Sequence, residues 1–105
     1  MTETETTTQK LSRFETARFC LESLMANCSR LIQAEEAKPE PDQAFIDQLK
    51  ARRREYRRLR NDLDFDDRRQ VEDAIATYGS QAKAAMQQAE RQDAGASRLT
   101  GRQPG

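Results

Sequence analysis

The chain has 105 residues and a mass of 12.1 kDa, and its 18 basic and 18 acidic side chains give a formal net charge of zero. This length fits one small domain, and the sixteen Leu, Ile, Val and Phe residues are too few for a large core. The sequence contains no His, the commonest general base and the commonest metal ligand in proteins. We therefore expect a protein that is not an enzyme and that holds no metal and no cofactor.

The two ends of the chain contain few large apolar residues that could form a core. Residues 1–9 are mostly Thr and Glu, and residues 93–105 contain three of the four glycines. We expect disordered tails over 1–9 and 93–105 and one helical domain over 10–92. The start has neither the basic nor the apolar part of a secretory signal, and no apolar run is long enough to span a membrane. These features predict a cytoplasmic protein without a membrane partner.

Apolar residues recur at steps of three and four in the first third of the chain, which predicts an amphipathic helix over about residues 9–37. The stripe consists of Leu11, Phe14, Ala17, Leu21, Leu24, Met25, Cys28, Leu31 and Ile32. Cys20 and Cys28 lie in this helix about 12 Å apart at helical rise, beyond the roughly 7 Å that a disulfide can bridge. We expect two free, buried thiols in a reducing compartment, with an intermolecular bridge or a redox-active thiol as the alternative.

The segment 38–42, with Pro39 and Pro41, predicts the end of this helix, because proline disfavours helical backbone in the residue before it. Asp42 is placed to cap the next helix. The apolar stripe of that second helix consists of Phe45, Leu49, Tyr56, Leu59 and Leu63. Arg52 takes the place that the heptad gives to a core residue.

The apolar stripe changes phase near residues 61–66. Turn and cap residues gather there, namely Asn61, Asp62, Asp64, Asp66 and Asp67. The stripe resumes with Phe65, Val71, Ile75, Tyr78, Ala82, Ala85, Met86 and Ala89. We expect a break at this point and a third helix over about 65–92, with one long bent helix as the alternative.

No alternating pattern predicts a strand, so the expected fold class is all-α. Each stripe is too narrow for its helix to be stable alone, and the connections are short. We expect an antiparallel three-helix bundle, or a helical hairpin with a third helix, in which the alanine-rich third helix is held least firmly. A coiled-coil-like homodimer would cover more of the stripes, and we expect self-association.

Residues 50–60 hold seven basic side chains and one acidic side chain, a local charge of +6. Arginine predominates, and its planar guanidinium suits bidentate binding to carboxylates. We predict an interaction protein, a regulatory or accessory subunit, whose Arg-rich helix docks on an acidic surface of a protein partner. The residues expected to bind are Lys50, Arg53, Arg54, Arg57, Arg58 and Arg60.

Other interpretations of the basic residues stay open. They can form a solvated face with pairs such as Arg58 to Asp62 and Arg68 to Glu72, and with pairs across helices to Glu15 and Glu22. Nucleic acid is a less favoured partner, because the acidic residues weaken the field that phosphate binding needs.

Residues 71–87 resemble a helix-turn-helix motif in spacing, with Gly79 at the turn. The resemblance implies a DNA-binding transcriptional regulator as the alternative function. Its candidate contacts are Ser80, Gln81, Lys83 and Gln87. A glycine inside an alanine-rich helix is the simpler interpretation.

The four aspartates of residues 62–67 are the one candidate for catalysis, as ligands of a divalent cation or as an acid–base pair. They lack the glycine and the closing glutamate of a calcium loop. Helix capping explains them more simply.

Overall fold

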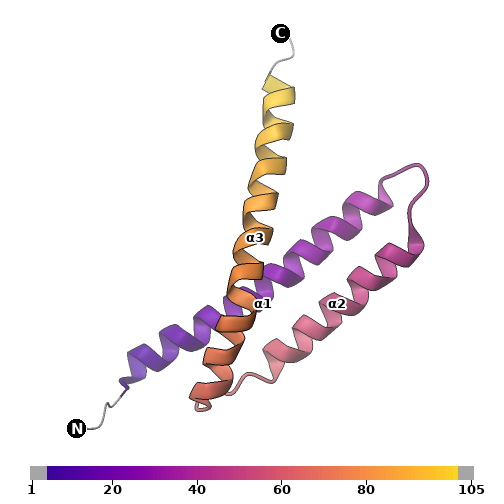
Figure 1. The fold of residues 1–105 in the computed structure, drawn as a ribbon. Coiled ribbons are helices and arrows are strands. Elements are labelled where there is room, and N and C mark those ends of the chain that lie inside the picture. The colour runs from indigo at the N-terminus through magenta and orange to yellow at the C-terminus, as the bar shows by residue number, and fades with distance from the viewer. Residues whose placement is uncertain (1–4, 102–105) are drawn as a thin grey trace.

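A computed structural model describes residues 5–101 of the chain, with side chains over 5–91. These residues form three helices, α1 (Thr7–Glu36), α2 (Gln43–Asn61) and α3 (Arg68–Gly101), and contain no strand (Figure 1). The predicted all-α class is therefore confirmed. The predicted break is also present, because α2 ends at Asn61 and α3 begins at Arg68.

The helix bounds differ from the predicted ones at both ends of the chain. Helix α1 begins at Thr7 because Thr6 and Gln9 form a capping box: the Thr6 hydroxyl accepts from the Gln9 N–H at 3.1 Å, and the Gln9 side chain accepts from the Thr6 N–H at 2.9 Å. Helix α3 starts three residues later than predicted and runs to Gly101. The predicted tails thus overlap helix at residues 7–9 and 93–101, and residues 1–4 and 102–105 lie outside the described part.

Helices α1 and α2 form an antiparallel hairpin (Figure 1). Asp42 caps α2 as predicted, since its carboxylate accepts from the Phe45 N–H at 3.1 Å. The buried Glu35 carboxylate accepts from the Lys38 ammonium and from the Asp42 N–H, both at 2.9 Å. These two bonds join the end of α1 to the start of α2 and lower the pKa of Glu35.

The buried core includes Ala17, Leu21 and Val71 and two small clusters. Ile32, Ile46 and Leu49 pack inside the hairpin, with Leu31 against them. The second cluster lies where α3 crosses α1 and contains Cys20, Leu24, Ala82 and Ala85, with Tyr56 and Tyr78 against it.

The predicted stripes are only partly correct. Leu11 and Met86 were expected in the core but are 46% and 42% exposed. On α2, Phe45 is exposed while Ile46 is buried. The burial therefore shifts by one residue at the start of α2, because the side chain that faces α1 depends on where the turn places the helix.

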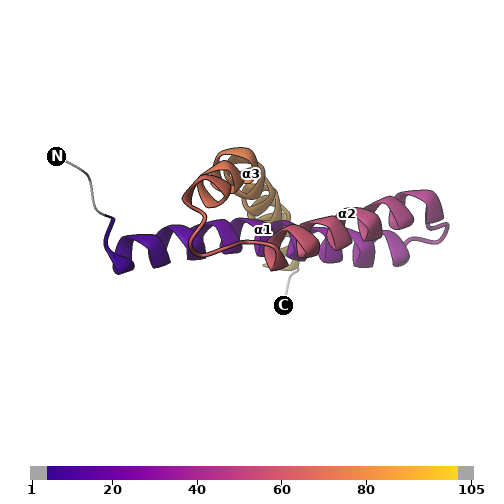
Figure 2. The ribbon, with the colours of Figure 1, turned by 90° about the horizontal axis from the view of Figure 1, so that it is seen from below.

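Helix α3 crosses α1 and diverges from the hairpin, as Figures 1 and 2 show. The connection that precedes α3 is held on α1 by an edge-to-face contact of Phe14 with Phe65, whose ring centroids are 5.7 Å apart. Within the described part, no close backbone contact joins α2 to α3, although the rings of Tyr56 and Tyr78 meet at 6.0 Å. Of the two arrangements predicted, the structure is the helical hairpin with a third helix.

Candidate partner-binding surface

The six basic residues predicted to bind a partner do not share one face of α2. Arg53 donates to the Ser29 hydroxyl at 2.9 Å, and Arg60 pairs with Glu22 at 3.4 Å, so both side chains reach α1. The predicted cross-helix pair to Glu22 is therefore confirmed.

Arg58 lies on the solvent side of α2 and forms ion pairs with Glu55 and, at 3.2 Å, with Asp62. The hydrogen bond from Arg58 lowers the pKa of Glu55. The Arg58 to Asp62 pair was predicted from four-residue spacing, as was the pair of Arg68 with Glu72 at 2.9 Å. Three of the six residues therefore already have partners within the chain.

The other three, Lys50, Arg54 and Arg57, form what we call the cationic flank. Their spacing of four and three residues places them along one side of α2 over about 10 Å. Arg54 and Arg57 are exposed and Lys50 is half-buried. None of the three forms an ion pair with any residue that the structure describes.

Arg52, which was not among the predicted binding residues, lies on the opposite side of α2 and lines a groove of about 390 Å³ between the three helices. The groove also contains Cys28 and Tyr56. Burial raises the pKa of both groups, while the charge of Arg52 acts in the other direction. The thiol is therefore protonated at neutral pH and is a poor nucleophile.

Cys20 and Cys28 are both free and buried, which confirms the expectation that they do not bridge. Burial also raises the pKa of Cys20. Both thiols serve as small apolar groups in the contact of α1 with its neighbours.

The aspartates between α2 and α3 fix the connection of these helices. Asp64 accepts from the Asp66 N–H at 2.9 Å, and Asp67 caps α3 by accepting from the Gln70 N–H at 3.0 Å. Asp66 pairs with Lys10 at 2.9 Å. In the part of the chain with described side chains, no group of three or more His, Cys, Asp or Glu residues could hold a metal ion.

Helix α3 continues through Gly79, which has no positive φ, so residues 71–87 contain no turn. The segment therefore lacks helix-turn-helix geometry, and the simpler interpretation of Gly79 is correct. Ser80, Gln81, Lys83 and Gln87 are exposed on this single helix, with Lys83 as their only cation. Binding of nucleic acid at these residues stays a prediction.

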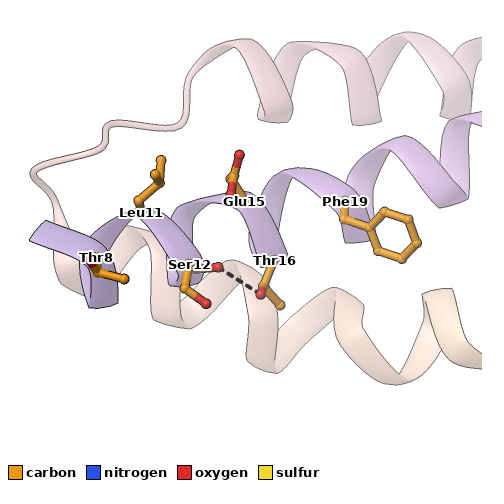
Figure 3. Close-up of a pocket in the computed structure, with 6 residues that line it drawn as sticks. All are labelled: Thr8, Leu11, Ser12, Glu15, Thr16 and Phe19. Atoms are coloured by element: carbon orange, nitrogen blue, oxygen red, sulfur yellow. Dashed lines mark hydrogen bonds between the residues drawn. The ribbon is translucent and has the colours of Figure 1, made fainter.

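The N-terminal half of α1 exposes two large apolar side chains, Leu11 and Phe19, among polar ones. A shallow hollow of about 410 Å³ is lined by Thr8, Leu11, Ser12, Glu15, Thr16 and Phe19 (Figure 3). All six residues belong to α1, so the hollow is a helix face and not an enclosed cavity. Glu15 lies here and forms no ion pair with a described residue, so its predicted pair with the second helix is wrong.

Comparison of the chain with protein-family models, with curated proteins and with solved structures found no match. None of the helices, over the residues described, is long and apolar enough to span a membrane. The functional argument therefore depends on the surfaces described above.

Proposed function

We propose that the protein is a non-enzymatic interaction protein, an accessory or regulatory subunit, that docks on an acidic surface of a partner protein through the cationic flank. The observation that carries this proposal is the lack of carboxylate partners for Lys50, Arg54 and Arg57 within the described residues. The chain has as many acidic as basic side chains. The acidic side chains that the structure describes therefore lie elsewhere on the molecule, and the three cations of the flank are not neutralised by them. Such a surface is expected to bind the carboxylates of another protein.

A protein partner suits the flank better than nucleic acid. Duplex DNA carries one negative charge per roughly 1.7 Å of axis, and tight binding requires many phosphate contacts. The flank offers three cations in a chain of zero net charge. We also propose a reducing compartment, the cytoplasm, which is supported by the two free thiols.

Single substitutions that each remove one positive charge from α2 test the role of the flank. We expect Arg54→Gln and Arg57→Gln each to weaken partner binding about 5- to 10-fold, as loss of a charge-assisted hydrogen bond does. Arg58→Gln removes the same charge from the same helix, but Arg58 is already paired with Glu55 and Asp62. It should leave binding nearly unchanged.

The measurement is a titration, by calorimetry, of a partner captured from the native host, with circular dichroism to verify the helix content of each variant. Equal losses for all three variants would contradict a role of the flank. Tight, salt-sensitive binding to a DNA duplex would favour the regulator instead.

Self-association is a second proposal. It is supported by Leu11 and Phe19, which are 46% and 55% exposed and line the same hollow on α1, because large apolar side chains that gather at the surface mark contact sites. Sedimentation equilibrium tests it: Phe19→Ser should weaken any dimer, and a wild-type protein that is monomeric at all concentrations would contradict it.

A further inference from the structure

A groove opens between the α1–α2 hairpin and the middle of α3, residues 81–91, on the side of α2 away from the cationic flank. Helix α3 diverges from the hairpin there, as Figure 1 shows. The groove has a volume of about 390 Å³, and each of the three helices contributes to its lining.

The floor of the groove is apolar. Leu24 and Leu49 are core residues whose edges reach the groove, and Leu31 is half-buried beside them. Helix α3 contributes Ala84 and Ala85. Because these side chains are single methyl groups, a further helix could approach the backbone of α3 closely.

Among the lining residues whose side chains the structure describes, the charged ones are Arg52 from α2 and Arg91 from α3. Both are positive, and none of these described lining residues is acidic. Neither arginine forms an ion pair with a residue whose side chain the structure describes. The two cations therefore lie on different helices beside an apolar floor, and no carboxylate among the described side chains neutralises them.

The shape of the floor suits a helix. Leu24, Cys28 and Leu31 follow one another on α1 at steps of four and three, the same spacing as the anchors of an amphipathic helix docked in a groove. The region between α2 and α3, which make no close backbone contact in the described part, is the place that a packing helix would take in a regular bundle.

We propose that this groove binds an amphipathic helix of a partner protein, with Leu-type side chains on the floor and Asp or Glu side chains beside Arg52 and Arg91. This is a second binding surface, separate from the cationic flank. The proposal does not depend on the flank, because it involves other residues of α2 and adds α3.

A synthetic peptide tests the groove directly. The probe is a lactam-stapled helix of about 14 residues, or roughly 21 Å, with Leu at every third and fourth position and Glu on both sides of that stripe. A second peptide has Gln in place of each Glu. Binding to the full chain is measured by fluorescence anisotropy. We expect the Glu peptide to bind at least 10-fold more tightly than the Gln peptide.

Variants in the groove carry matched controls. Arg52→Gln and Arg91→Gln should each weaken binding of the Glu peptide about 5-fold, whereas Arg54→Gln, on the flank, should not change it. Ala84→Glu should weaken it at least 10-fold. Ala76→Glu makes the same change at an exposed position of α3 outside the groove and should have little effect, which separates loss of the site from loss of folding.

Several outcomes would overturn the proposal. They are failure of the Glu peptide to bind, equal binding of the Gln peptide, and binding that is unaffected by Arg52→Gln and Arg91→Gln. Loss of self-association in Ala84→Glu, with no peptide bound by the wild type, would identify a second copy as the occupant. Loss of peptide binding in Arg54→Gln alone would assign the peptide to the flank.

Discussion

Leu21 is the most completely buried large side chain of α1, with 0% of its surface exposed. Removing buried methyl groups from such a site loses apolar burial and leaves a cavity, at a cost of about 2–5 kcal/mol. We expect Leu21→Ala to lower the free energy of unfolding by that amount in urea denaturation. The whole free energy of unfolding of a natural domain is about 5–15 kcal/mol, so this loss is a large fraction of it.

The matched control for this prediction is Leu11→Ala. Leu11 lies on the same helix but is 46% exposed, so its change should stay within about 0.5 kcal/mol. Similar losses at both positions would show that the exposed face of α1 is covered in solution.

Glu35 couples the hairpin turn to pH. The Lys38 ammonium and the Asp42 N–H lower the pKa of this carboxyl from its ordinary value of 4.5. The folded protein therefore holds the proton less firmly than the unfolded chain. Glu35 stabilises the fold at pH values above 4.5, and this contribution is lost as the pH falls through the lowered pKa.

We therefore expect Glu35→Gln to be less stable than the wild type at pH 7, with a difference that shrinks towards pH 3. Urea denaturation over this pH range measures it. Glu55 and Glu72 also have lowered pKa values, so only the difference between the two proteins isolates Glu35. A difference that stays constant with pH would show that the carboxylate makes neither bond.

At the scale of the helices, Gly79 tests whether α3 is continuous. A Cβ placed at this position would meet only the side chain of Ile75, at 4.0 Å, and the backbone has no positive φ. Alanine is favoured over glycine inside a helix by about 0.5–1 kcal/mol. Gly79→Ala should raise the melting temperature without loss of ellipticity at 222 nm. Destabilisation would indicate a turn at Gly79.

The two breaks between the helices were the features best predicted from sequence, because short-range chemistry determines them. Asp42 caps α2 and the change of phase after Asn61 marks a real break. The sequence predicted less well which face of each helix is buried. Ile46 instead of Phe45 enters the core, since the rotation of α2 depends on the turn that Glu35 ties to Asp42.

The contacts of the candidate site also differ in whether the sequence predicts them. The pair of Arg58 with Asp62 follows from spacing within one helix. Spacing does not predict the bond of Arg53 to Ser29 or the position of Arg52 in a groove. They depend on the packing of three helices, and in particular on the angle at which α3 crosses α1. The periodicity of α3 predicts which face is apolar but does not determine that angle.

At the scale of the whole molecule, the crossing makes the particle long and thin. Its extents are 65, 35 and 16 Å, and its radius of gyration is 17.9 Å. A compact domain of this length has a radius of gyration of about 13 Å. The difference arises because α1 extends beyond α2 and α3 projects away from the hairpin, as seen in Figure 1.

X-ray scattering in solution, extrapolated to zero concentration, should therefore give a radius of gyration near 17.9 Å. The Phe19→Ser variant should give the same value and serves as the control against self-association. A radius near 13 Å would mean that α3 folds back along the hairpin. Leu31 and Leu49 would then pack against α3, and the groove between Arg52 and Arg91 would be closed to a partner helix.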